Sequence, residues 1–159
     1  MSTSSPDEQY TERALSILKQ NGNRITAPRK AVIALLAESQ IPLSAYDIFD
    51  LLTERKTAVD VASIYRILEC LESNHLIHKT FHQGKVFRCR LEEHHHNETG
   101  GECHAQHDCH HSLLCKQCGT VQEVHCYGMN QLMQDLEQQW GFKAESHLLQ
   151  ITGLCAQCK

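Results

Sequence analysis

The chain has 159 residues, enough for one domain or two small ones with modest hydrophobic cores. Hydrophobic residues make up 41% and charged residues 21% of the sequence, which excludes a disordered chain. No apolar run approaches the ~20 residues of a membrane-spanning helix. Residues 1–8 also lack the basic and apolar stretches of a secretory leader. We therefore expect a cytoplasmic globular protein without a membrane partner.

Cysteine and histidine are frequent, with 9 and 12 residues, and both concentrate in the second part of the chain. An odd number of thiols without a secretory leader indicates metal binding rather than a disulfide framework. Charge divides the chain in the same way. Residues 1–90 carry 12 basic and 10 acidic side chains, a net of +2, whereas residues 91–159 carry 3 and 9, a net of −6. This pattern predicts a boundary near residues 90–93.

The first part of the chain predicts helices followed by a hairpin. Apolar residues recur with helical spacing, small polar residues stand where helices need N-caps, and Gly22 and Gly84 provide a stop and a turn. In chain order, we expect a helix over 8–21, a helix capped by Thr26, a helix beginning at Ser44, a helix over about 61–73 capped by Asp60, and strands over 76–80 and 86–90.

The fourth predicted helix has a surface suited to DNA. At ~100° per residue its apolar side chains fall on one arc, while Ser63 and Arg66 point away and Tyr65 lies at the edge. Small residues permit close approach to a major groove, Arg can bind guanine, and Tyr can reach a phosphate or a thymine methyl. Together with a hairpin whose Lys79 can contact phosphate, this is a winged helix-turn-helix layout. The alternative is an ordinary amphipathic helix with a solvated face.

Two matched Cys-x-x-Cys pairs are the strongest signal in the second part: Cys115 with Cys118, and Cys155 with Cys158. Each pair can place two thiolates on one turn, and two such turns complete a tetrahedral zinc site with four sulfur ligands. Such a site has no open coordination position, which predicts a structural zinc whose binding free energy contributes to folding. The alternatives are redox-active motifs or free thiols.

The residues between the two pairs predict a small unit with a strand over 120–124, a helix over about 129–139 and a strand over 144–152. A unit of this size rarely buries enough apolar surface alone. Its strand edges and leftover apolar faces therefore favour a homodimer.

A His- and Cys-rich segment, residues 94–111, precedes this unit. Such tracts either contact metal or form solvated loops that bind metal loosely. The expected fold class is α+β, with a winged helix-turn-helix domain followed by a small α/β dimerisation domain. The expected domains are a DNA-binding domain over 1–90 with its wing at about 76–90, a His/Cys-rich hinge and loop over 91–111, and a dimerisation and metal-binding domain over 112–159.

Several motifs run in unbroken order over about residues 8–159: Arg24-Ile-Thr-Ala-Pro-Arg29, Ser44-Ala-Tyr-Asp-Ile-Phe-Asp-Leu-Leu52, Ser63-Ile-Tyr-Arg66, Leu76-Ile-His-Lys79, Cys115-x-x-Cys-Gly119, Gly141-Phe, and His147 followed by Leu-Cys-x-x-Cys158. Together they resemble the ferric uptake regulator (Fur) family of bacterial metal-responsive repressors. The resemblance implies a homodimer that binds an inverted-repeat operator in double-stranded DNA when metal is bound. The DNA contacts it implies come from Arg24, Arg29, Ser63, Tyr65, Arg66 and Lys79.

Within the family the chain is most similar to the zinc uptake regulator branch. Leu76-Ile-His78 and Val86-Phe-Arg-Cys89 match the sensor motif of that branch, which implies a sensor zinc bound by His78, Cys89 and His110. A fourth sensor ligand is expected in the His/Cys-rich segment. His96 is our choice for it, and the alternatives are His94, His95, Cys103, His107 and Cys109.

The resemblance also implies an additional metal site formed by His111, Glu123 and His147, and Glu123 matches a sensor position as well. At least two zinc ions per chain are therefore expected, one structural and one regulatory. The chain departs from the family pattern at Ser112, where the family often has a further His.

Ligand chemistry favours zinc independently of the resemblance. A thiolate with imidazoles is softer than the carboxylate-rich sites that suit Fe(II) or Mn(II), and zinc is redox-silent, so a thiolate ligand survives. We expect a zinc-activated repressor of zinc uptake genes that has no small organic substrate. A relative that senses Fe, Mn, Ni or peroxide would have the same fold, and a His-rich zinc buffer is a further alternative. An enzyme is not expected, because the sequence has no His-Glu-x-x-His and no deaminase motif.

Overall fold

The computed structural model describes residues 5–80, 84–89, 111–124, 129–143 and 149–159. The chain divides into two compact units, Met1–Arg90 and Leu91–Lys159. Helices and small sheets both occur, which confirms the α+β fold class. Within the described residues, no helix has the length and apolar character needed to cross a bilayer.

The first unit contains four helices and a hairpin: α1 (Pro6–Gln20), α2 (Ala27–Glu38), α3 (Ala45–Glu54), α4 (Val61–Ser73), β1 (Ile77–Lys79) and β2 (Val86–Arg88). The predicted N-caps Thr26, Ser44 and Asp60 each accept a hydrogen bond from a backbone N–H in the first turn. The first helix begins at Pro6 rather than at residue 8. Ser5 and Glu8 form a reciprocal capping box there, and Pro6 suits the first helical position.

The four helices bury one continuous apolar core. Its largest fully buried side chains come from every helix and from the start of the hairpin: Leu18, Ile33, Leu36, Ile48, Leu52, Ile64, Leu71 and Leu76. On α4, the predicted core residues Ile64, Ile67, Leu68 and Leu71 are buried, while Val61 is half-buried. The opposite face of α4 is exposed.

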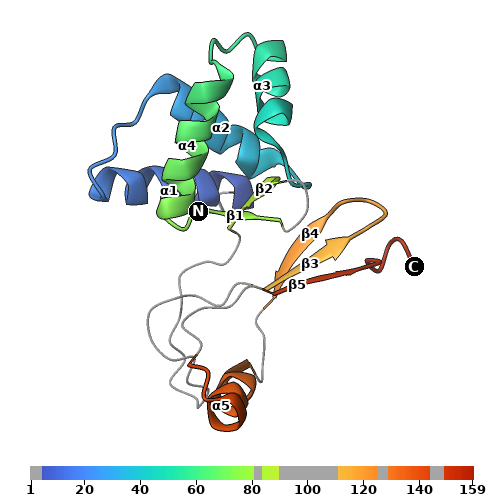
Figure 1. The fold of residues 1–159 in the computed structure, drawn as a ribbon. Coiled ribbons are helices and arrows are strands. Elements are labelled where there is room, and N and C mark those ends of the chain that lie inside the picture. Colours follow the sequence, from blue (N-terminus) through green and yellow to red (C-terminus); the bar gives the residue numbers. More distant parts are fainter. Residues whose placement is uncertain (1–4, 81–83, 90–110, 125–128, 144–148) are drawn as a thin grey trace. The chain divides into compact units, whose positions relative to one another are not determined.

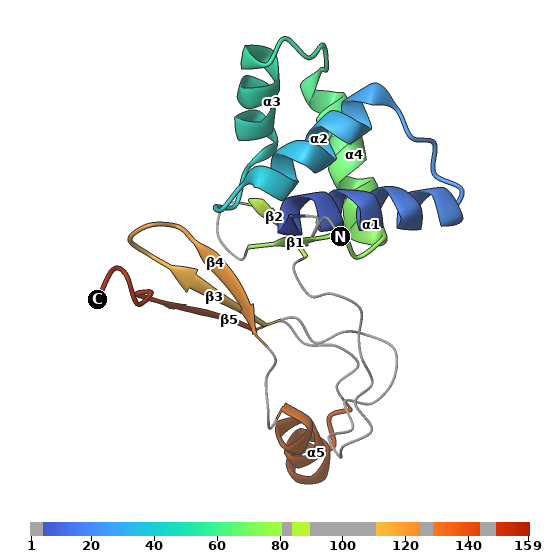
Figure 2. The ribbon, with the colours of Figure 1, turned by 180° about the vertical axis from the view of Figure 1, so that it is seen from behind.

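The hairpin completes a winged helix-turn-helix, as predicted. β1 and β2 are antiparallel, and both strands lie beside α1 in the two views of Figures 1 and 2. Val86 also exchanges two backbone hydrogen bonds with Leu43, each 2.8 Å long, so β2 is joined to the residue before the N-cap of α3. The hairpin is therefore anchored to the helix-turn-helix itself.

The second unit contains β3 (His111–Cys115), β4 (Val121–Val124), α5 (Met129–Trp140) and β5 (Leu149–Gly153). In its three-stranded sheet β3 is central, antiparallel to β4 and parallel to β5. The expected strand over 120–124 and helix over 129–139 are found, and β5 covers the end of the strand expected over 144–152. β3 was not expected from the sequence, since its polar His111-Ser112 start gives a weak strand signal.

Candidate metal centres and nucleic-acid interface

Four sulfur atoms meet where β3 and β5 end. Those of Cys115, Cys118, Cys155 and Cys158 all lie within 4.8 Å of one another, and the thiols are free. The sulfur atoms of Cys118 and Cys155, which stand on different turns, are 3.7 Å apart. A zinc tetrahedron with Zn–S bonds of about 2.3 Å has sulfur–sulfur edges of about 3.8 Å, so this group fits zinc. We call it the four-cysteine site.

The backbone explains how the two turns meet. The parallel register of β3 and β5 places Cys115 opposite Gly153, and the N–H of Lys116 donates to the Gly153 carbonyl at 2.9 Å. The first turn closes at Gly119, whose φ of 74° favours a residue without a side chain. The N–H of Cys155 then reaches the Cys115 sulfur at 3.4 Å.

The thiols of the four-cysteine site differ in acidity. Backbone N–H groups of Cys118 and Cys155 lower the pKa of Cys115 to about 6. A hydrogen bond with the Thr120 hydroxyl lowers the pKa of Cys118 as well. A hydrogen bond with the Cys155 thiol raises the pKa of Cys158 to about 12. A divalent cation is what would allow all four sulfur atoms to ionise together.

His78 and Cys89 lie on one face of the hairpin. In the register His78 is opposite Phe87, and the N–H of Cys89 donates to the Leu76 carbonyl at 2.9 Å, so strand alternation puts both side chains on the same side. A ring nitrogen of His78 and the Cys89 sulfur lie within 4.8 Å of each other. Cys89 is buried and His78 is half-buried. An imidazole and a thiolate this close are suitable as two of the four ligands of a zinc ion.

The sheet separates two residues that were predicted to share the additional site. The β3–β4 register pairs His111 with Val124 and Ser112 with Glu123. Because paired residues share a face and neighbours alternate, His111 and Glu123 stand on opposite faces of the sheet. The described strands therefore do not bring these two side chains together. His96, His110 and His147, the remaining predicted metal ligands, lie outside the described residues.

The outward face of α4 carries the predicted DNA-reading residues. Arg66 and Tyr65 are exposed, Tyr65 to 49%, and they share a stripe with the exposed Ala62 and Glu69. Ser63 is half-buried, and its hydroxyl donates to the Asp60 carboxylate at 2.6 Å, so it belongs to the helix cap. Small, aromatic and cationic side chains on one exposed stripe fit the wall of a major groove.

The other predicted DNA contacts lie outside α4. Arg24 is exposed in the segment before α2, and Arg29, in the first turn of α2, donates through its guanidinium to the Arg24 carbonyl. Lys79 on β1 is exposed and forms an ion pair with Glu72. An exposed pair of this kind contributes little to stability, so Lys79 can exchange Glu72 for a phosphate.

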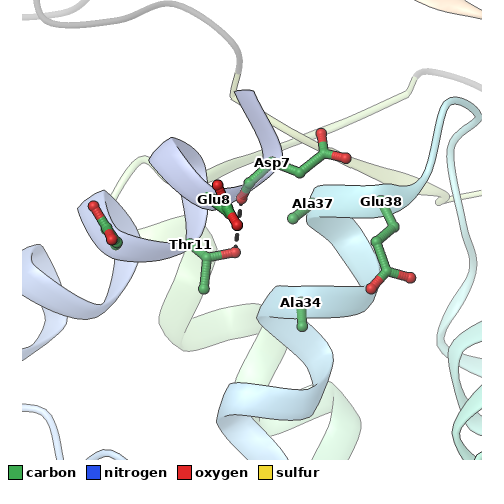
Figure 3. A pocket seen from close by; sticks show the side chains of 7 residues that line it. Asp7, Glu8, Thr11, Ala34, Ala37 and Glu38 are labelled. Atoms are coloured by element: carbon green, nitrogen blue, oxygen red, sulfur yellow. Dashed lines mark hydrogen bonds between the residues drawn. The ribbon is translucent and has the colours of Figure 1, made fainter. Parts of the chain in front are cut away.

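A cavity of about 330 Å³ between α1 and α2 is lined by carboxylates (Figure 3). Glu8 caps the Ser5 N–H, Glu38 pairs with Arg55, and Asp7 pairs with Arg88. The backbone carbonyl of Asp7 also accepts a 2.8 Å hydrogen bond from the Thr11 hydroxyl, as Figure 3 shows. These three carboxylates already bind groups of the protein itself, and we assign no ligand to the cavity.

Three residues of α1 that lie beside the hairpin, Asp7, Tyr10 and Arg13, were not predicted from the sequence. Tyr10 donates from its hydroxyl to the Leu76 carbonyl, Arg13 donates to the Cys89 carbonyl, and Arg88 pairs with Asp7. The available signal was the spacing of Asp7, Tyr10 and Arg13 at every third position, which places them on one side of a helix.

Comparison with known proteins agrees with this architecture. The model of the ferric uptake regulator family matches residues 20–152. The ferric uptake regulation protein of Bacillus subtilis (strain 168) is 28% identical over 152 residues, 95% of each chain. The zinc uptake regulation protein of Escherichia coli (strain K12) is 26% identical over 151 residues, 95% of this chain and 82% of that protein. A solved zinc uptake regulator complexed with zinc and DNA is 25% identical with a TM-score of 0.78, over 98% of this chain and 96% of that one.

The family match extends from the last residue of α1 into β5 and covers most of the chain. It includes the helix-turn-helix, the hairpin with His78 and Cys89, and the first turn of the four-cysteine site. The chain therefore belongs to the ferric uptake regulator family of metal-responsive DNA-binding transcriptional regulators, whose members are not enzymes.

Proposed function

We propose that this protein is a zinc-activated repressor that binds an inverted-repeat operator as a homodimer and controls zinc uptake genes. The observation that carries the proposal is the thiol–imidazole pair of Cys89 and His78 on the wing. This donor pair is soft and suits zinc better than Fe(II) or Mn(II). The likeness to a zinc uptake regulator complexed with zinc and DNA supports the same choice.

Two zinc ions per chain have different tasks in this proposal. The first fills the four-cysteine site permanently and stabilises the second unit, because a closed site of four thiolates has no position for a substrate. The second is the regulatory ion, held by His78 and Cys89. By resemblance, His110 is a further ligand, and Glu123, which lies on the face of the sheet without His111, matches a sensor position as well. His96 is our choice for the fourth ligand.

In this proposal, each part of the chain has its own role. Residues 1–90 form the DNA-binding domain, with α4 in the major groove and Lys79 of the wing near the phosphates of the DNA backbone. Residues 91–111 form the hinge, and residues 112–159 form the dimerisation and structural zinc domain. A regulatory ion that takes ligands from both sides of residue 90 restricts the angles available to the DNA-binding domains. Couplings of this kind are typically worth about 1–3 kcal/mol.

The proposal of a homodimer is supported by apolar surface on the second unit. None of the described side chains at residues 131–140 of α5 is buried. β5 stands at an edge of the sheet, where its backbone can pair with another strand. Among the described residues of this unit, the exposed large apolar side chains are Leu132, Trp140, Phe142, Ile151 and Leu154. A second copy of the chain would cover them and double the number of recognition helices.

A metal titration of DNA binding tests the proposal. An operator is first selected from genomic fragments by the zinc-loaded protein. Binding to it is then measured against buffered free Zn(II), Fe(II), Mn(II) and Ni(II), with the metal content determined in parallel. We expect zinc to activate binding at the lowest free concentration and one tightly held zinc to remain throughout. Activation by Fe(II) or Mn(II) at lower concentrations, or loss of binding on peroxide treatment alone, would favour the alternative that the protein senses another signal.

A further inference from the structure

Helix α1 is fastened to the end of the hairpin that carries Cys89. The Tyr10 hydroxyl donates to the Leu76 carbonyl at 3.0 Å, and the Arg13 guanidinium donates to the Cys89 carbonyl at 2.6 Å. Leu76 and Cys89 are themselves joined across the hairpin by a 2.9 Å backbone hydrogen bond. Tyr10 and Arg13 are three residues apart and lie on one side of α1. One turn of the helix therefore bonds to two residues, Leu76 and Cys89, that face each other across the hairpin.

An ion pair also joins α1 to β2, one helix turn before Tyr10. The guanidinium of Arg88, whose side chain is only 8% exposed, forms a 2.7 Å ion pair with Asp7. The guanidinium carbons of Arg88 and Arg13 lie 5.7 and 5.8 Å from the centre of the Tyr10 ring, which is within range of cation–π attraction. We call Asp7, Tyr10 and Arg13 the α1 clamp.

The α1 clamp determines where the Cys89 side chain can go. Cys89 follows the last residue of β2, and its N–H donates to the Leu76 carbonyl in the hairpin ladder. A charge-assisted hydrogen bond from the Arg13 guanidinium holds the Cys89 carbonyl. With both its N–H and its C=O held, the Cα–Cβ bond of Cys89 has a set direction, toward the face that carries His78.

We propose that the α1 clamp is a positioning device for the regulatory zinc, with Arg13 and Tyr10 as the positioning residues. This inference rests on the proposed role of Cys89 as a zinc ligand. Residues that hold a ligand in place contribute to metal affinity because the site then needs less reorganisation when the ion binds. Tyr10 is part of the buried core with Ala14 and Leu18, so the clamp also joins the ligand to the helices that bind DNA.

The test uses cobalt(II) as a spectroscopic probe on the full-length protein. The four-cysteine site is first filled with zinc, which binds nitrogen and sulfur ligands more tightly than cobalt does. Cobalt is then titrated, and the thiolate-to-cobalt charge-transfer band reports Cys89 in the second site. We expect Arg13→Ala to weaken cobalt binding about 10- to 100-fold. Arg13→Lys, which keeps a cationic donor, should recover most of that loss.

Two further variants control for stability and charge. Tyr10→Phe keeps the ring and its packing but removes the hydroxyl, and it should weaken cobalt binding by a smaller factor while the helical circular dichroism is unchanged. Lys19→Ala removes an exposed cation near the end of the same helix, and should leave cobalt binding as in the original protein. If Arg13→Ala fails to fold, Tyr10→Phe and Arg13→Lys decide the matter.

The outcomes separate this inference from the proposed function. If Cys89→Ser abolishes the charge-transfer band but Arg13→Ala and Tyr10→Phe both bind cobalt within twofold of the original protein, the clamp has no positioning role and the inference is wrong. If Cys89→Ser leaves the band unchanged, the assignment of Cys89 as a ligand is wrong, and the inference is wrong with it. A loss in Arg13→Ala that Arg13→Lys reverses supports the clamp.

Discussion

Cys89 lies diagonally across the β1–β2 hairpin from His78, on the same face, with the two ligand atoms within 4.8 Å. The strand that leads to Cys89 also bonds through Val86 to Leu43, directly before the cap of α3. An ion bound by His78 and Cys89 would therefore be connected to the helix-turn-helix by backbone hydrogen bonds. This is the route by which we propose that metal binding affects DNA binding.

Replacing one cysteine of the four-cysteine site should abolish its zinc binding. Cys118→Ser is expected to lower the zinc content by one ion per chain and to unfold the second unit, because metal binding and folding are coupled in small zinc units. The first unit has its own core and should keep its helical circular dichroism. Cys70→Ser is the matched control, since its thiol bonds to Asn23 in the first unit. A Cys118→Ser protein that retains all its zinc contradicts the assignment.

Acid should weaken zinc binding to the four-cysteine site in two stages. Because the pKa of Cys158 is raised to about 12, this thiol keeps its proton at neutral pH and must release it to zinc. The affinity should therefore fall at least about tenfold per pH unit between about pH 8 and pH 6. The pKa of Cys115 is lowered to about 6, so below this pH a further proton competes with zinc and the slope should steepen. Chelator competition at several pH values measures this slope, and an affinity independent of pH would be inconsistent with thiolate ligands.

Arg66 is expected to contact DNA bases and so contribute to the sequence specificity of binding. Arg66→Ala should weaken operator binding by about 1–3 kcal/mol, roughly 5- to 150-fold, and reduce the preference over random DNA, while the zinc content stays the same. Arg55→Ala removes the same charge from the end of α3 and should affect binding far less. Gel-shift titrations on operator and random DNA measure both effects. Equal operator affinity for Arg66→Ala and the original protein would remove α4 from the proposed interface.

Ser44→Ala should destabilise the first unit by about 1 kcal/mol, because Ser44 and Asp47 form the capping box of α3. For a domain of this size the melting temperature should fall by about 4–8 °C. The backbone N–H of Ser44 lowers the pKa of Asp47, so the stabilisation from this carboxylate is present above its ordinary pKa of 3.8 and is lost as the pH falls further. Ser16→Ala, on an exposed position of α1, is the control and should change the melting temperature little.

Local signals predicted most of the first unit. Caps at Thr26, Ser44 and Asp60 mark helix starts because a side-chain oxygen must satisfy an N–H there, and the sequence shows that oxygen directly. β3 was missed because its strand character comes from pairing with β4 and β5 rather than from its own residues. Propensity for strands depends on such neighbours, which are far away in the sequence.

The candidate metal ligands could be predicted from the sequence to different degrees. Cys115 and Cys118 are recognisable because metal-binding turns have a fixed spacing. The opposite faces of His111 and Glu123 follow from a register that the sequence does not display. The contact of Arg13 with the Cys89 carbonyl spans 76 residues and depends on how α1 packs, so no local pattern contains it.

A regulatory zinc bound through Cys89 should control DNA binding, and its effect on operator affinity can be measured in the presence and absence of this thiol. Operator affinity of the original protein and of Cys89→Ser is measured against buffered free zinc, with the four-cysteine site filled in both. We predict a steep rise in affinity for the original protein and a flat, weak response for Cys89→Ser, with one zinc per chain retained. A Cys89→Ser protein that gains operator affinity at the same free zinc concentration as the original protein would show that Cys89 is not a ligand of the regulatory zinc.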